Sequence, residues 1–259
     1  MSNASNGECR HGVRGIAAWG KPALIAAALA AFLAMPAGAR AAECPAAPNL
    51  PSSDGSQPAN LGVLKLQLLD YKCFGAYERD VAIVLAEAQA YVEKRADPAA
   101  KLALVLDIDE TSLSNWPNLL ADDFGFIFDG TCEHLPKGPC GFDAWIARQA
   151  AEAIRPTLDL FNAAKARNVS IFFITGRGEA QRAATINNLK AAGYDGWADL
   201  IMKQPGDKSP VRTFKTMSRK QIEDRGFVII ANVGDQDSDL DGGHAERTFK
   251  VPNPFYFIP

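Results

Sequence analysis

The chain has 259 residues, and its 27 basic and 30 acidic side chains give a formal net charge of −3 at pH 7. No basic tract or basic helix is present, so the sequence gives no support to nucleic-acid binding. It also contains no internal repeat or low-complexity tract, which favours a single globular domain behind the N-terminal segment.

The first segment has the order of a cleavable export signal. A basic region precedes an apolar core over residues 23–34, and an A-x-A cleavage site follows at residues 39–41. That core is too short to span a bilayer stably. We therefore expect residues 1–41 to be removed on export to the periplasm or the medium, with cleavage after Ala39 or Ala42 as alternatives and with no stable membrane anchor.

Residues 42–60 are rich in Pro, Ser, Ala and Asn and predict a flexible lead-in. The mature chain keeps an even number of cysteines, which in an oxidising compartment suggests two disulfides, with three pairings open. Cys132 and Cys140 flank a turn that contains Pro and Gly, so we expect them to pair, leaving Cys44 with Cys73. No C-x-x-C motif is present, and zinc is not expected.

Alternating helical and strand patterns follow the lead-in. Apolar residues at helical spacing from Tyr77 to Val92 predict an amphipathic helix that ends near residues 97–98. The short branched run Leu102–Leu106 predicts a buried parallel strand. Further strands are expected at 170–175, 198–202, 226–233 and 248–251, and further helices at 156–167 and 179–192. This alternation predicts an α/β fold with a doubly wound parallel sheet.

Two aspartates follow the first predicted strand directly. Asp107 and Asp109 lie two residues apart, so extended backbone turns both side chains to one side. They also lie at the carboxyl end of the strand, where open α/β sheets bind their ligands. Like carboxylates in this position repel each other unless a cation holds them or one takes a proton. Either arrangement is useful in catalysis.

Two other strands end in polar residues of complementary kinds. The strand at 170–175 ends in the Thr175 hydroxyl and the backbone N–H groups around Gly176, which suit phosphate oxygens. The strand at 226–233 runs into an acidic loop that contains Asp235 and Asp239. If the strands are neighbours, the carboxylates share one pocket and require a hard divalent cation, for which Mg²⁺ is the expected ion.

The motifs DIDET (107–111), FFITGR (172–177) and GDQDSD (234–239), in this order, resemble motifs I, II and IV of the haloacid dehalogenase (HAD) superfamily. The segments 106–115, 232–240 and 249–259 more narrowly resemble class III, B-type acid phosphatases, a group that includes bacterial periplasmic enzymes and plant vegetative storage proteins. The resemblance covers about residues 61–259. It implies a HAD-like Rossmannoid fold with a small helical lid, formed by the N-terminal helices and an insertion over about 112–153.

The resemblance also implies roles for individual residues. Asp107 would be the nucleophile that forms an aspartyl-phosphate, and Asp109 the general acid and base. Thr175 and Gly176 would bind the transferring phosphoryl group. Lys215 is the expected lysine that neutralises nucleophile and phosphate, with Lys220 and Lys208 as alternatives. The Mg²⁺ ligands would be four aspartates: Asp107, Asp109 through its backbone carbonyl, Asp235 and Asp239.

The expected activity is that of an exported Mg²⁺-dependent phosphomonoesterase acting on small phosphate monoesters, with nucleotides and aryl phosphates as candidates. The alternative is a non-enzymatic storage or binding protein on the same scaffold, as in plant relatives that lost the nucleophile. The presence of Asp107 favours the enzyme. Transfer of the phosphoryl group to alcohols is a third possibility, since alcohols compete with water for an aspartyl-phosphate. Asp237 is expected to be a solvated loop carboxylate with no catalytic role.

Overall fold

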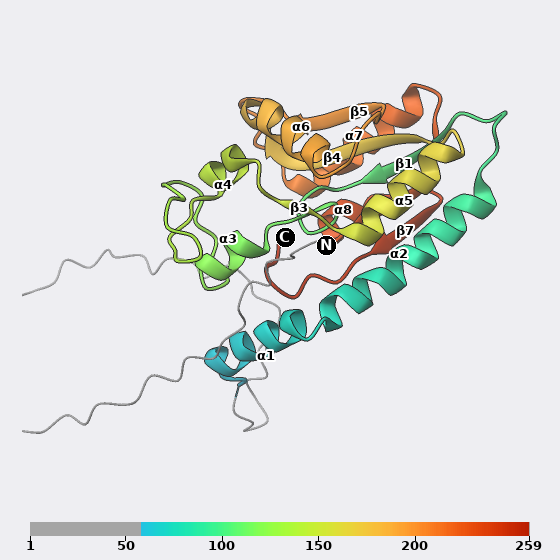
Figure 1. The fold of residues 1–259 in the computed structure, drawn as a ribbon. Coiled ribbons are helices and arrows are strands. Elements are labelled where there is room, and N and C mark those ends of the chain that lie inside the picture. The colour runs from blue at the N-terminus through green and yellow to red at the C-terminus, as the bar shows by residue number, and fades with distance from the viewer. Residues whose placement is uncertain (1–57, 259) are drawn as a thin grey trace, which may run out of the picture. The chain divides into compact units, whose positions relative to one another are not determined.

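The computed structural model describes residues 58–258, so the predicted signal and Cys44 lie outside the described residues. At its centre is a five-stranded parallel sheet with the order β5-β4-β1-β6-β7 (Figure 1). The strands are β1 (Leu102–Leu106), β4 (Ser170–Gly178), β5 (Asp199–Lys203), β6 (Val228–Gly234) and β7 (Arg247–Lys250). The predicted doubly wound α/β fold is thereby confirmed.

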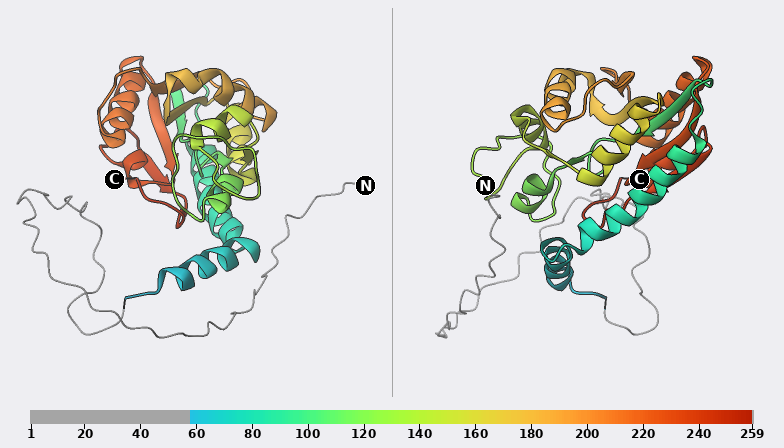
Figure 2. Two further views of the ribbon diagram at one scale, coloured as in Figure 1. Left: turned by 90° about the vertical axis from the view of Figure 1, so that its left-hand side faces the viewer. Right: turned by 45° about the vertical axis from the view of Figure 1, so that its right-hand side comes forward.

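Strand β1 occupies the middle of the sheet because all five of its side chains are apolar and buried. Its side chains alternate between two cores. Leu104 and Leu106 pack in the larger core, together with side chains of the helices α2 (Ala76–Arg95), α5 (Arg155–Ala166) and α6 (Arg182–Ala191). Ala103 and Val105 pack in the smaller core against Ile222 of α7 (Val211–Asp224). Figure 2 shows α7 (orange) and α5 (yellow) on opposite faces of the sheet.

The helices at the N-terminal end differ in how well the sequence predicts them. Helix α2 carries the expected stripe, with Tyr77, Val81, Leu85, Ala88 and Val92 all buried. Helix α1 (Leu61–Cys73) is not predicted, because its apolar residues form no single face and none of its side chains is buried. A short 3₁₀ turn, η1 (Glu179–Gln181), precedes α6, so the helix predicted from residue 179 is divided in two. No described helix is both long and apolar enough to cross a membrane.

The insertion after β1, expected to form a lid, folds into a small unit that is called the lid below. Its two ends pair as the short antiparallel strands β2 (Leu113–Ser114) and β3 (Glu152–Ala153), which close the base of the insertion. Between them lie α3 (Trp116–Ala121) and α4 (Phe142–Arg148). The predicted disulfide between Cys132 and Cys140 is confirmed. Aromatic rings supply the packing, with Trp116 and Phe124 centred 6.0 Å apart.

Candidate active site

The carboxyl ends of β1 and β6 bring together the acidic residues that the sequence places more than a hundred positions apart. Asp107 follows β1, whereas Asp235 and Asp239 follow β6, and these strands are adjacent in the sheet. One carboxylate oxygen from each of the three lies within 4.8 Å of the other two, and all three residues are buried. The predicted convergence of the two acidic clusters is therefore present.

A single lysine lies among these carboxylates. The Lys215 ammonium, near the start of α7, donates to Asp107 Oδ1 and, at 2.5 Å, to Asp239 Oδ1. The residue is only 4% exposed. The two alternatives lie elsewhere: Lys220 pairs with Asp224 on the surface of α7, and Lys208 is exposed in the loop before that helix. The geometry thus places Lys215 at Asp107, the predicted nucleophile, while the roles of both residues in the reaction stay predictions.

The charges of this cluster are not balanced by protein groups alone. Burial raises the pKa of Asp107 well above its ordinary value; Lys215 opposes this shift, whereas Asp239 and Asp235 add to it. Burial, and then the charge of Asp239, raise the pKa of Asp235 to about 7. Three buried carboxylates with one ammonium carry an excess of negative charge, and oxygen donors of this kind match the ligand preference of Mg²⁺. The residues present therefore fit a hard divalent cation.

Gly234 at the end of β6 allows Asp239 to approach the strand. A Cβ at position 234 would lie 2.3 Å from the Asp239 Cβ, which is far inside van der Waals contact. Asp239 is further fixed by the Gln236 backbone N–H, which donates to its Oδ2 at 2.9 Å. Asp237, the first residue of the short helix α8 (Asp237–Leu240), is exposed. The glycine of this motif is thus required for packing of the acidic loop.

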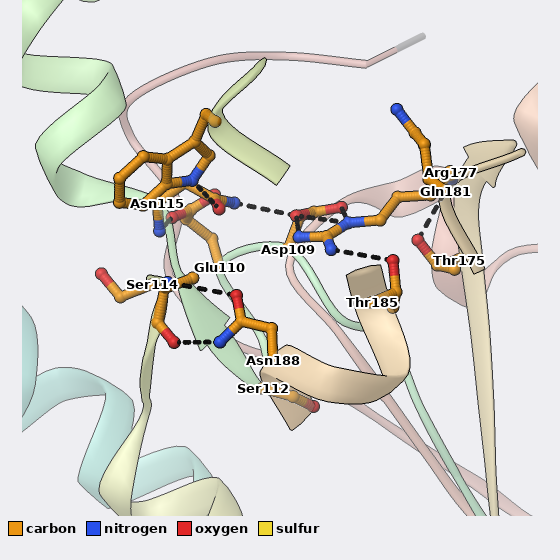
Figure 3. A network of polar contacts seen from close by, with 12 residues as sticks. Asp109, Glu110, Ser112, Ser114, Asn115, Thr175, Arg177, Gln181, Thr185 and Asn188 are labelled. Atoms are coloured by element: carbon orange, nitrogen blue, oxygen red, sulfur yellow. Dashed lines mark hydrogen bonds and ion pairs between the residues drawn. The ribbon is translucent and has the colours of Figure 1, made fainter. Parts of the chain in front are cut away.

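Asp109 forms an ion pair with Arg177, as Figure 3 shows. The guanidinium binds both carboxylate oxygens, with Nη2 at 2.6 Å from Oδ1 and Nε at 3.1 Å from Oδ2. Asn115 Nδ2 donates to Oδ1 at 2.9 Å. Although burial raises the pKa of Asp109, the charge and hydrogen bonds of Arg177 outweigh it and lower the pKa overall. If Asp109 is a metal ligand here, its backbone carbonyl is the group available, because the carboxylate is already occupied by these donors.

Thr175 and Gly176 lie at the end of β4, which neighbours β1 on the side away from β6. Thr175 is buried, and its hydroxyl accepts the Arg177 backbone N–H at 3.2 Å. Gly176 is exposed, and a Cβ added there would meet only Val211 of α7 at 3.8 Å. The loop therefore leaves the backbone accessible beside the Lys215 helix, as a phosphate-binding loop requires.

Two residues of the site were not predicted from the sequence. Arg177 is 4% exposed, and Nη1 also donates to Thr185 of α6 at 3.1 Å. Glu110 is buried and accepts Asn115 Nδ2 at 3.0 Å and the Tyr256 hydroxyl at 3.1 Å. Burial, and then the nearby Asp109, raise the pKa of Glu110 to about 7 despite these hydrogen bonds. The one available signal was the closeness of each charged residue to a predicted site residue, because Arg177 lies two positions after Thr175 and Glu110 directly follows Asp109.

A parallel sheet with acidic and hydroxyl groups at the ends of three adjacent strands is the arrangement expected of a HAD-type hydrolase. The family model of the HAD superfamily, subfamily IIIB (acid phosphatase), matches residues 61–259. The chain belongs to this family, which confirms the resemblance of its motifs and assigns it to the phosphomonoesterases.

Individual relatives agree with the family assignment. The chain is 35% identical to the stem 28 kDa glycoprotein of Glycine max over 70% of each chain. It is also 35% identical to acid phosphatase 1 of Solanum lycopersicum, over 60% of this chain and 58% of the relative. A solved class C acid phosphatase from Bacillus anthracis has the same fold, with a TM-score of 0.60 at 24% identity over 76% of this chain and 86% of that one.

Replacement of Gly234 by alanine tests the packing of the acidic loop. The added methyl group would overlap Asp239, so we expect Gly234→Ala to lower the free energy of unfolding by about 1–3 kcal/mol. Gly178→Ala is the matched control, because a Cβ there meets nothing within 4 Å. Urea denaturation of both variants measures the difference, and equal stabilities would contradict the packing role.

The ion pair between Arg177 and Asp109 is less exposed than the nearby pair between Arg182 and Glu179. We therefore expect its loss to lower the free energy of unfolding by more. Arg177→Gln leaves Asp109, whose side chain is 19% exposed, with a weaker partner, and we expect a loss of about 3 kcal/mol in unfolding free energy. Arg182 pairs with Glu179 at the surface, and Arg182→Gln should cost no more than about 1 kcal/mol. Denaturation curves that show similar losses for the two variants would be inconsistent with this interpretation.

Proposed function

We propose that this chain is an exported, Mg²⁺-dependent acid phosphatase that hydrolyses small phosphate monoesters through an aspartyl-phosphate on Asp107. The observation that carries the proposal is the contact of the buried Asp107 carboxylate with Lys215, inside a cluster of three carboxylates that fits a divalent cation. This arrangement combines a carboxylate nucleophile with the positive charge needed to receive a phosphate dianion.

The reaction has two half-steps. In the first, an Asp107 oxygen forms a bond to phosphorus while the bond to the leaving oxygen breaks, and Asp109 donates a proton to that oxygen. In the second, Asp109 takes a proton from water, which attacks phosphorus and releases phosphate from Asp107. Lys215 offsets the charge of the nucleophile and the phosphoryl oxygens throughout. Bound Mg²⁺, held by Asp107, Asp235, Asp239 and the Asp109 carbonyl, would supply further charge neutralisation.

The remaining roles follow from position. Thr175 and Gly176 would hydrogen-bond the phosphoryl oxygens from the end of β4. Because Arg177 lowers the pKa of Asp109, acidic conditions are needed to favour the protonated form that departure of the leaving group requires. Nucleotides and aryl phosphates are the candidate substrates, and alcohols are candidate acceptors in place of water.

A storage or binding role is the second candidate, because one relative, vegetative storage protein 2 of Arabidopsis thaliana, is 28% identical over 71% of this chain. The presence of Asp107 in contact with Lys215 favours the enzyme. Export is inferred from the N-terminal 41 residues alone, which lie outside the described residues.

Replacement of the nucleophile tests the proposed mechanism. We expect Asp107→Asn to reduce hydrolysis of a chromogenic aryl phosphate by at least about 10³-fold, because the amide cannot attack phosphorus. The variant should still fold, since Lys215 keeps Asp239 as a partner, and circular dichroism checks this. Asp237→Asn, which changes an exposed carboxylate of the site's second acidic loop, is the control and should keep full activity. Retention of most activity in Asp107→Asn would refute the assignment of the nucleophile.

Removal of divalent cations distinguishes a Mg²⁺-dependent enzyme from a metal-independent enzyme and from a storage protein. We expect a chelator to abolish aryl phosphate hydrolysis and added Mg²⁺ to restore it, because Lys215 alone leaves the carboxylate cluster with excess negative charge. The measurement is the initial rate before and after chelation and after titration with Mg²⁺. A rate that the chelator does not change, or no hydrolysis under any condition, would count against the proposal.

A further inference from the structure

The chain after β7 returns to the carboxylate cluster. Asn253 Nδ2 donates to Asp235 Oδ2 at 2.6 Å, and Lys250 Nζ donates to the Asp235 backbone carbonyl at 3.1 Å. Gln236 Nε2 donates to the same Oδ2 at 2.7 Å, whereas Oδ1 receives only the Thr111 hydroxyl, at 3.1 Å. Two amide donors therefore hold one oxygen of Asp235, and the other keeps more of its capacity to accept a ligand.

The orientation of the Asn253 amide is fixed by its own turn. Its Oδ1 accepts the backbone N–H of Phe255 at 2.9 Å, so Nδ2 is the group that faces Asp235. Pro252 and Pro254 flank the residue, and proline restricts the backbone on both sides. The donor is thus set in place by local structure as well as by its contact with the carboxylate.

Aromatic packing anchors this turn to the rest of the molecule. Phe255 is buried, and its ring contacts one residue of α2 and two of the lid, with centroid distances of 5.1 Å to Tyr77, 5.4 Å to Trp116 and 6.2 Å to Phe124. Beyond it, the Ile258 backbone N–H donates to Gln236 Oε1 at 3.1 Å. Ring packing at Phe255 and the hydrogen bond at Ile258 therefore hold the segment that contacts Asp235.

We propose that Asn253 is a positioning residue of the metal site, which holds Oδ2 of Asp235 so that the carboxylate is presented to the cation together with Asp107 and Asp239. This inference rests on the proposed function, because it requires that the cluster binds Mg²⁺. Hydrogen bonds to the outer oxygen of a ligating carboxylate orient the ligand, and their loss typically weakens metal affinity by about 10–100-fold.

The test is Mg²⁺ binding to the chelator-treated, dialysed protein, measured by isothermal titration calorimetry and by the thermal shift that Mg²⁺ produces. The variant is Asn253→Ser, because a serine hydroxyl can still accept the Phe255 N–H but cannot reach Asp235. Phe257→Ala is the matched control, since this residue of the same segment is 63% exposed. Asn253→Ala serves as the second variant, in which both the contact and the turn are lost.

We expect Asn253→Ser to raise the dissociation constant for Mg²⁺ by about 10–100-fold, with a melting temperature in the absence of metal close to that of the wild type. Phe257→Ala should bind Mg²⁺ as the wild type does. An affinity within about twofold of the wild type in both Asn253 variants would overturn the positioning role and leave the proposed function intact. A wild-type protein that binds no Mg²⁺ would overturn the metal site itself, and the role of Asn253 with it.

Discussion

The main physical constraint on this structure is that three carboxylates and one ammonium share a buried pocket. Asp107, Asp235 and Asp239 would repel one another strongly there, and Lys215 offsets only part of that repulsion. A folded chain can carry this arrangement only if a cation or bound protons complete the balance. The unfavourable electrostatics of the empty cluster are thus the same feature that would make it bind a cation tightly, and a bound cation would in turn offset the charge of a phosphate.

The parallel sheet makes this arrangement possible because it aligns strand ends that are distant in sequence. Adjacent β1 and β6 supply the carboxylates, β4 supplies the residues predicted to bind phosphate, and α7 brings Lys215 to the same edge. Gly234 then lets the acidic loop fold back onto its own strand. Each of these positions depends on backbone geometry, so the site is preorganised before any ligand arrives.

The sequence predicted those parts of the molecule whose signals are local. Strand β1, the stripe of α2 and the Cys132–Cys140 pair could be read from neighbouring residues, and the spacing of family motifs selected Lys215 over two other lysines. Helix α1 was missed because it has no buried face. Arg177, Glu110 and Asn253 were missed for a different reason: their partners lie between 5 and 146 positions away, and mostly in other elements. A charged or amide side chain gives no periodic pattern that points to such a partner.

The C-terminal segment contacts both the lid and the carboxylate cluster. Phe255 packs against Trp116 and Phe124 of the lid, and Asn253, two residues before it, holds a carboxylate of the proposed metal site. The turn between them is closed by a hydrogen bond and flanked by prolines, which restrict its backbone. One short segment therefore contacts both the lid aromatics and the carboxylate cluster. It can do so because β7 runs parallel to β6, β1 and β4 and ends at the edge of the sheet where the proposed chemistry takes place.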